Sequence, residues 1–237
     1  MRTIAILPIK GFGSAKQRLS ALLGSGSRQA LAQAMFSDVL ASLRHVRRLD
    51  AIAVVTAEPA AESVVRRTDV HLLHDREQSG QSAATAIGIA HALEQGFDRA
   101  LLVPGDTPLL DPNELDAMLE RAEGEARAVT IVPDRHQSGT NALLLSPPTA
   151  IDPSFGPGSL ERHRAAARKA GVSYRVEAIL SLTLDVDTPA DLAELAECLE
   201  ERRGHAPMTR GALRQLDRSQ VRGTMPSRRG AATGLAV

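Results

Sequence analysis

The chain has very few aromatic residues: of its 237 residues, four are Phe, one is Tyr and none is Trp. Proteins that bind single-stranded nucleic acid stack bases on aromatic side chains, so this composition disfavours that class. Cysteine is scarce as well, because Cys198 is the single thiol, which excludes an internal disulfide and a cysteine zinc cluster. We therefore expect a protein of the reducing cytoplasm, with Cys198 as a packing residue in a late helix.

Long hydrophobic runs and nucleophile motifs are also missing. No apolar run approaches the roughly 18 residues that a membrane helix needs. The opening segment MRTIAILPIKG is too short for a signal peptide and predicts a strand. No G-x-S-x-G motif occurs, and the His residues lack the spacing of metal ligands. We expect His45, His91 and His163, which fall in predicted helices, to lie at the surface or at an edge.

Lysine is rare although positive charge is not. The chain balances 28 basic against 28 acidic residues, but 25 of the basic residues are Arg and three are Lys. Two of these three, Lys10 and Lys16, lie in one loop, PIKGFGSAKQRL. A lysine ammonium is a compact point charge that suits phosphate. The pairing therefore favours a phosphate-binding loop over a chance feature of a solvated loop.

Short apolar segments alternate with helical patterns along most of the chain. Strands are predicted at residues 3–9, 51–56, 70–74, 99–104, 128–132, 141–145 and 172–178. Helices are predicted at residues 27–46, 58–67, 82–95, 112–122, 158–170 and 189–202. This alternation is typical of an α/β fold with a mainly parallel sheet. Ligands of such sheets bind at the carboxyl ends of the strands, so the loops there hold the candidate site.

The pattern ends near Gly204. Residues 204–237 contain six Arg and one acidic residue, Asp217, which gives a net side-chain charge of +5. Scattered Gly, Pro and Ser and the lack of a sustained apolar face predict a disordered basic tail. The alternative is an arm for nucleic acid or a membrane surface, which the absence of aromatic residues and of an amphipathic stretch disfavours.

The loop after the first strand combines glycines with positive charge. Gly11 and Gly13 let the backbone turn and present N–H groups, while Lys10, Lys16 and Arg18 supply the charge. Such a loop can cradle a triphosphate. It does not match the G-x-x-x-x-G-K-[ST] phosphate loop, and the alternative is an ordinary surface loop.

An acidic residue, Asp106, follows the predicted strand at 99–104 in the segment PGDTPLL. A carboxylate at a strand end can cap the next helix, but Asp111, Pro112 and Glu114 already form a better helix start. Asp106 is therefore not needed as a cap. We expect it to bind Mg²⁺, which prefers hard oxygen ligands.

A second acidic segment, DVDTPADL, spans residues 185–192. Thr188 is the expected helix cap, which leaves Asp185 and Asp187 free; in an extended segment these two side chains point to the same side. Asp106 with Asp185 or Asp187 would form a Mg²⁺ site if both segments lie at one edge of the sheet. The alternative is that Asp187 serves the helix terminus.

Two further segments place small residues before predicted elements: Ser138-Gly139-Thr140-Asn141 and Phe155-Gly156-Pro157-Gly158-Ser159. The second opens a helix, whose N–H groups can bind an anion. Together with PIKGFGSAKQRL, PGDTPLL and DVDTPADL, the FGPGS segment resembles the 2-phospho-L-lactate/phosphoenolpyruvate guanylyltransferases of deazaflavin coenzyme F-420 biosynthesis. The resemblance covers about residues 3–198.

This resemblance implies a fold, an activity and a cofactor. The family has the nucleotidyltransferase fold of type A glycosyltransferases, a Rossmann-like sheet with helices on both faces, which we assign to residues 1–203. The implied reaction transfers GMP from GTP to the phosphate of a small phosphorylated carboxylic acid, releases pyrophosphate and uses Mg²⁺. The acceptor phosphate is already an anion, so the reaction needs no general base, in keeping with a site rich in Lys, Asp and Gly.

The resemblance also implies residue roles. The catalytic set is Lys10, Lys16 and Asp106, and the metal ligands are Asp106 and Asp185 or Asp187. The phosphorylated acid is received by Thr140, Gly156 and Ser159. The nucleotide contacts are Gly11, Lys16, Arg18, Gly80, Ser82 and Gly105. Gly80 and Ser82 belong to the segment SGQSAA at residues 79–84, which resembles the family's Gly-Leu-Asn-x-Ala stretch near the base, with Gln81 and Ser82 in place of Leu and Asn.

Three hypotheses stay open on the sequence. The first is the guanylyltransferase, acting on phosphoenolpyruvate, 2-phospho-L-lactate or 3-phosphoglycerate. The second is another nucleotidyltransferase with a sugar phosphate, sugar alcohol or molybdopterin acceptor. The third is a non-catalytic nucleotide-binding or nucleic-acid-associated protein that uses the basic tail.

Overall fold

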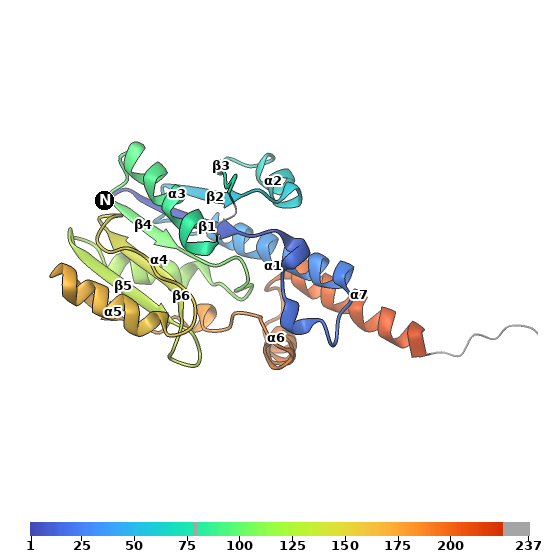
Figure 1. The fold of residues 1–237 in the computed structure, drawn as a ribbon. Helices are drawn as coiled ribbons and strands as arrows, with labels where there is room; N and C mark the ends of the chain where they lie inside the picture. The colour runs from blue at the N-terminus through green and yellow to red at the C-terminus, as the bar shows by residue number, and fades with distance from the viewer. Residues whose placement is uncertain (78–79, 225–237) are drawn as a thin grey trace, which may run out of the picture.

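A computed structural model describes residues 1–77 and 80–224 and shows one sheet of seven strands within them (Figure 1). The strands are β1 (Thr3–Ile9), β2 (Ala51–Thr56), β3 (His71–His74), β4 (Arg99–Leu102), β5 (Ala128–Pro133), β6 (Thr140–Ser146) and β7 (Ser173–Val176). Their order in the sheet is β3-β2-β1-β4-β6-β5-β7. Only β6 runs antiparallel to its neighbours β4 and β5 among these strands. The predicted α/β fold with a mainly parallel sheet is confirmed.

The six predicted helices form at nearly the expected positions, and the last helix of the described chain was not predicted. The helices are α1 (Ser25–Leu43), α2 (Pro59–Val65), α3 (Gln81–Glu94), α4 (Pro112–Arg121), α5 (Ser159–Ala170), α6 (Pro189–Glu201) and α7 (Pro207–Thr224), with short 3₁₀ turns η1 (Phe12–Ser14), η2 (Gln17–Leu19) and η3 (Leu180–Leu182). Asp111 caps α4 through the Asn113 N–H at 2.8 Å, and Thr188 caps α6. Both caps confirm the prediction and leave Asp106 outside that role.

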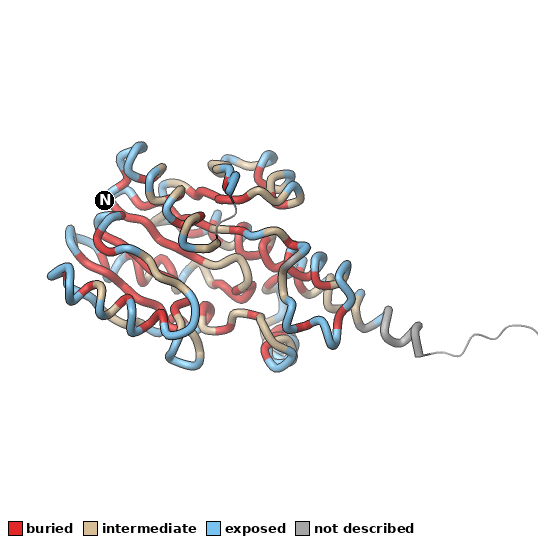
Figure 2. Tube along the Cα trace, in the orientation of Figure 1, coloured by how far each residue is buried: buried red, intermediate tan, exposed pale blue. Residues whose placement is uncertain are grey.

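Helices cover both faces of the sheet because the strand residues alternate in direction. On β1, Ala5 and Leu7 face the cluster that contains α1, α2 and α4, whereas Ile4 and Ile6 face the cluster with α3 and α5. Figure 2 shows the central strands β1, β2, β4, β5 and β6 as mostly buried, whereas the edge strands β3 and β7 are half-buried or exposed. Each buried Ile or Leu side chain contributes about 2 kcal/mol by leaving water, so the sheet holds its edge in a fixed position.

Helix α7 overturns the predicted disorder from residue 204. It packs beside α1 (Figure 1) and brings Leu213 and Leu216 to the cluster formed by α6 and the loop after β1. The Asp38 carboxylate on α1 accepts the N–H groups of Met208 at 3.1 Å and Thr209 at 2.7 Å. The prediction was wrong over 207–224 because the helix has a short apolar stripe and takes its cap from a distant residue. The rest of the predicted tail, 225–237, lies outside the described residues.

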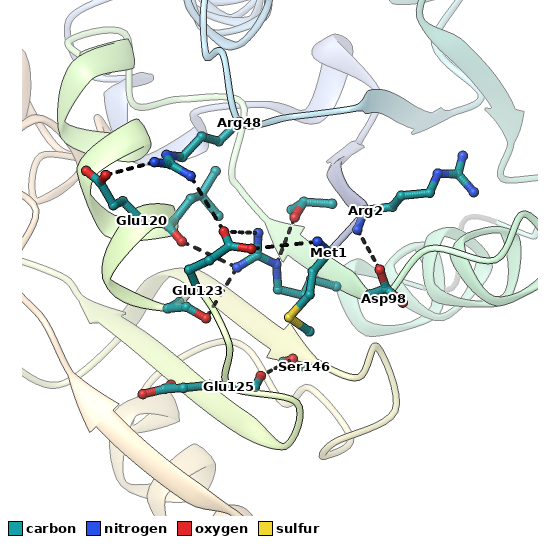
Figure 3. Close-up of polar contacts among 12 residues, drawn as sticks. Met1, Arg2, Arg48, Asp98, Glu120, Glu123, Glu125 and Ser146 are labelled. Carbon is teal, nitrogen blue, oxygen red and sulfur yellow. Dashed lines mark hydrogen bonds and ion pairs between the residues drawn. The ribbon is translucent and has the colours of Figure 1, made fainter.

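Polar contacts close the edge where β1 and β4 begin, opposite the candidate site (Figure 3). Arg48 pairs with Glu120 at 2.8 Å and with Glu123 at 3.6 Å, and the Arg2 N–H donates to Asp98 at 2.6 Å. The carboxyl ends of the same strands are left for the loops that build the site. Among the described helices, none has the length and apolar character that crossing a membrane requires.

Candidate functional site

Two adjoining cavities lie where β1 and β4 end and where the antiparallel β6 begins. The first cavity has a volume of about 330 Å³ and is lined by the loop after β1 and by α1. The second has a volume of about 410 Å³ and is lined by β6, the start of α5 and the acidic segment before α6. The residues common to both walls are Gln81, Pro104, Asp106 and Asp187. Any two ligands bound in these cavities would meet at this shared wall.

Lys16 lies at the junction of the cavities. It adopts a left-handed backbone conformation, with φ of 55°, and its side chain is 7% exposed. Its ammonium donates to an Asp106 carboxylate oxygen and to Asp187 Oδ1 at 2.9 Å. Burial lowers the pKa of Lys16, but the two carboxylates outweigh burial and hold this pKa above its ordinary value. Lys16 therefore places a fixed positive charge at the shared wall.

The acidic residues predicted to converge do so. The Val186 N–H donates to the Asp106 carbonyl at 3.2 Å, which ties the two acidic segments together through the backbone. Asp185 and Asp187 line the second cavity with Asp106. Burial and the nearby charge of Asp106 raise the pKa of Asp185. The expectation that both segments lie at one edge of the sheet is confirmed.

The observed arrangement of Asp106, Asp185 and Asp187 meets part of what a magnesium ion requires. Within residues 1–77 and 80–224, no three His, Cys, Asp or Glu side chains form a ready metal cluster, and the Lys16 ammonium lies between Asp106 and Asp187. Asp106 Oδ1, however, is buried and has no hydrogen-bond partner in the described part of the chain. Mg²⁺ usually takes one or two carboxylates together with substrate phosphates and water. Asp106 and the neighbouring Asp185 meet that requirement.

Two residues that the sequence analysis missed hold the acidic segment in place. Asn141 donates from Nδ2 to the Leu182 carbonyl at 2.7 Å and to Asp185 Oδ1 at 3.2 Å. Asp191 Oδ2 accepts the N–H of Asp187 at 2.9 Å, and the other Asp191 oxygen pairs with Arg135. The sequence signal for Asp191 was its position at the start of α6, which we interpreted only as part of the helix start.

The three residues predicted for the phosphorylated acid all line the second cavity. Ser159 is fully buried, and its hydroxyl has no hydrogen-bond partner in the described part of the chain. Gly156 has φ of +100°, a conformation that glycine adopts without strain. Thr140 is 9% exposed, and its hydroxyl lies 2.9 Å from His163 Nδ1.

The position of His163 corrects the expectation of a surface or edge residue, because its side chain is fully buried. It lies on the buried face of α5 with Leu160 and Ala167, at spacings of three and four residues. That periodicity was present in the sequence and could have found it. His45 is exposed and His91 half-buried, as expected.

Only some of the residues predicted to bind the nucleotide line one of the two cavities. Lys10 and Gly105 line the first cavity, whereas Arg18 lines the second. Of the described residues, Gly11, Gly80 and Ser82 line neither cavity. A Cβ at position 105 would lie 2.3 Å from Ile9 Cδ1, so a larger residue here would have to displace the end of the Ile9 side chain. Ser79, the first residue of the segment at 79–84, lies outside the described residues.

Residues 3–219 match the family model described as guanylyl transferase CofC like. The chain belongs to this CofC-like family. It is 49% identical over 219 residues to a phosphoenolpyruvate guanylyltransferase of Conexibacter woesei, covering 92% of this chain and 98% of the relative. It is 31% identical to a 2-phospho-L-lactate guanylyltransferase of Methanothermobacter thermautotrophicus over 195 residues, covering 82% of this chain and 84% of the relative.

The structural comparison supports the same fold. A solved nucleotidyl transferase from the same Methanothermobacter species superposes with a TM-score of 0.62 at 17% identity, covering 84% of this chain and 98% of that chain. The nucleotidyltransferase fold expected from the resemblance is confirmed. The CofC-like family match extends to residue 219, which includes much of α7 and agrees with the folded state of that segment.

Proposed function

We propose that this CofC-like protein transfers GMP from GTP to the phosphate of a small phosphorylated carboxylic acid, phosphoenolpyruvate or 2-phospho-L-lactate, and releases pyrophosphate in coenzyme F-420 biosynthesis. One observation carries the proposal: Lys16, on the wall of the first cavity, contacts Asp106 and Asp187, which line both cavities. Two substrates that react with each other need such a junction, and a reaction between two anions needs charge there.

The chain supplies positive charge and hydrogen-bond donors on both sides of this junction. Lys10 and Lys16 both line the first cavity, which we assign to the nucleotide, and Arg18 lines the second. The second cavity, which we assign to the acid, has Ser159, the first residue of α5, on its wall. The partly positive N-terminus of a helix binds anions well. The acceptor phosphate is ionised at neutral pH, so no general base is required.

Asp106 and Asp185 would hold a Mg²⁺ ion, with Asp187 available once Lys16 turns toward a phosphate. The ion would neutralise phosphate charge and orient the phosphates for in-line attack. The residues of the chain fix where this happens: Asn141 and Asp191 hold the acidic segment, and the backbone contact from Val186 holds it against Asp106.

The test is a pyrophosphate-release assay with GTP and Mg²⁺. Phosphoenolpyruvate, 2-phospho-L-lactate and 3-phosphoglycerate are supplied in turn, and ATP, CTP and UTP replace GTP as controls. We expect release with GTP and at least one of the first two acids, together with a guanylylated product of the matching mass. Release that requires a sugar phosphate, or none with any acid, would refute the proposal.

A further inference from the structure

The buried His163 connects the loop before α5 to the start of β6. The Ser154 N–H donates to His163 Nε2 at 2.9 Å, and Nδ1 lies 2.9 Å from the Thr140 hydroxyl oxygen. Because Nε2 accepts a hydrogen bond, it carries no proton. Burial and the charge of Arg162 lower the pKa of His163 to about 4, so the ring is neutral at physiological pH.

A neutral ring with an unprotonated Nε2 must carry its proton on Nδ1. His163 therefore donates to the Thr140 oxygen, and the Thr140 hydroxyl proton has to point elsewhere. In the described part of the chain no acceptor for that proton is found, and Thr140 lines the second cavity. The Ser159 hydroxyl on the same cavity wall is equally without a partner there. The Thr140 hydroxyl therefore offers a donor to a ligand in this cavity, and the buried Ser159 hydroxyl is a second polar group left unpartnered.

We infer that His163 is a positioning residue that commits the Thr140 hydroxyl to donate its proton to an anionic oxygen of the phosphorylated acid. The identity of the ligand rests on the proposed function, whereas the direction of the hydrogen bond rests on the geometry alone. An anionic oxygen is a pure acceptor, and a hydroxyl fixed as a donor is its matching partner. Hydrogen bonds to charged groups are stronger than neutral ones, so this arrangement favours binding.

A purely structural role for His163 would act through the loop at 154–157, but another residue holds that loop. The Arg162 guanidinium donates to the carbonyls of Ser154 at 3.1 Å, Phe155 at 3.0 Å and Gly156 at 3.3 Å. Loss of the contacts that His163 makes with the Ser154 N–H and with the Phe155 ring leaves these bonds in place. The effect on ligand binding is therefore expected through Thr140.

Two substitutions separate the two sides of the ring. His163→Gln keeps an acceptor near the position of Nε2 and loses the donor near Nδ1, whereas His163→Asn keeps a donor near Nδ1 and loses the acceptor. We expect H163Q to weaken the calorimetric affinity for phosphoenolpyruvate and to raise its KM by about tenfold, with the KM for GTP unchanged. H163N should recover most of this loss, and thermal unfolding should show both variants folded.

The decisive comparison combines H163Q with Thr140→Val, which removes the hydroxyl and keeps the shape. If His163 acts through Thr140, H163Q adds nothing in the T140V background. The inference would be overturned if H163Q and T140V raised the KM for phosphoenolpyruvate additively, or if H163Q and H163N raised it equally. It would also be overturned if H163Q raised the KM for GTP as much as the KM for phosphoenolpyruvate. If either variant fails to fold, the tautomer of His163 in the wild-type protein tests the inference instead. ¹⁵N NMR of protein with labelled histidine should show a proton on Nδ1 of His163, and a proton on Nε2 would overturn the inference.

Failure of the proposed function gives a different result. In that case the wild-type protein releases no pyrophosphate with any of the three acids. The inference is then judged by calorimetry with phosphoenolpyruvate alone: weaker binding to H163Q than to wild type supports it, and equal binding or no binding to either refutes it.

Discussion

Lys16 Nζ lies 2.9 Å from Asp187 Oδ1, although the two residues are 171 positions apart in the chain. The same ammonium contacts Asp106, so the ends of the first and fourth strands and the segment before α6 meet at one charge. A lysine held between two carboxylates is ready to exchange them for phosphate oxygens. The following predictions test this junction and the elements that support it.

Lys16→Ala should strongly impair turnover with GTP. Removing the ammonium leaves Asp106 and Asp187 without their shared counter-charge and removes the cation that we propose contacts the GTP phosphates. We expect kcat/KM for GTP to fall about a hundredfold. Lys169→Ala is the matched control, because Lys169 lies exposed in the last turn of α5, and this variant should behave as wild type. Unchanged KM and kcat in K16A would contradict the phosphate role.

Asp106→Asn should reduce kcat by a factor of about a hundred to a thousand, since it removes a negative charge on which both Lys16 and the proposed metal depend. The fold should persist because asparagine has nearly the same size. Asp111→Asn serves as the control: Asp111 caps α4, and asparagine caps helices equally well. Turnover in D106N close to that of wild type would show that the metal assignment is wrong.

Removal of divalent ions should abolish turnover and weaken nucleotide binding. After dialysis against EDTA, we expect no pyrophosphate release, with recovery on adding Mg²⁺. GTP should raise the melting temperature more with Mg²⁺ than without it, because a ligand that binds the folded state stabilises it. In Asp185→Asn this dependence of the GTP shift on Mg²⁺ should shrink. A shift equal with and without Mg²⁺ in the wild-type protein would exclude Asp106 and Asp185 as ligands of a GTP-bound ion.

Asp38→Ala should destabilise the protein by roughly 1–2 kcal/mol, measured as the free energy of unfolding in urea. Asp38 is buried and accepts two N–H groups at the start of α7. Hydrogen exchange should increase first in residues 207–216. Asp69→Ala is the control, because its carboxylate is 84% exposed and a surface ion pair contributes little. Equal stability of D38A and wild type would mean that α7 does not depend on this cap.

The stability contributed by Asp191 should depend on pH. Burial raises the pKa of Asp191, but the N–H groups of Thr188 and Asp187, with Arg135, outweigh burial and hold it below its ordinary value. A carboxyl with a depressed folded-state pKa stabilises the protein above its unfolded pKa of about 3.9, and this contribution is lost as the pH falls through the folded pKa. The free energy of unfolding of the wild type should therefore exceed that of Asp191→Asn by about 2 kcal/mol at pH 7. This difference should narrow below about pH 4. A difference independent of pH would contradict this cause.

Local signals in the sequence predicted much of the fold and of the site. The caps Asp111 and Thr188, each followed by proline, located two helices and showed that Asp106 was not needed as a cap. The strand pattern then predicted that Asp106 and Asp185 would lie at one edge. These features depend on residues close together in the chain, which is why sequence reasoning found them.

The features that it missed depend on distant partners. The cap of α7 comes from Asp38, about 170 positions away, so the helix looked unstable by itself. The apolar spacing of α5 marked His163 as buried, but its hydrogen bond to Thr140 becomes visible only when α5 lies against β6. The direction of β6 is set by its neighbours β4 and β5 rather than by its own residues.

The reversal of β6 has a consequence for how the molecule can vary. Consecutive strand residues point to opposite sides, and here Thr140 reaches His163 while Asn141 reaches the Leu182 carbonyl and Asp185. The proposed contact with the acid and the anchoring of the acidic segment thus belong to two adjacent residues. An insertion or deletion of one residue in the turn at 134–139 that shifted β6 by one position would turn each of these side chains to the opposite face. The contacts of Thr140 and of Asn141 would then be lost together. The length of this turn is therefore constrained by the contacts on both sides of it.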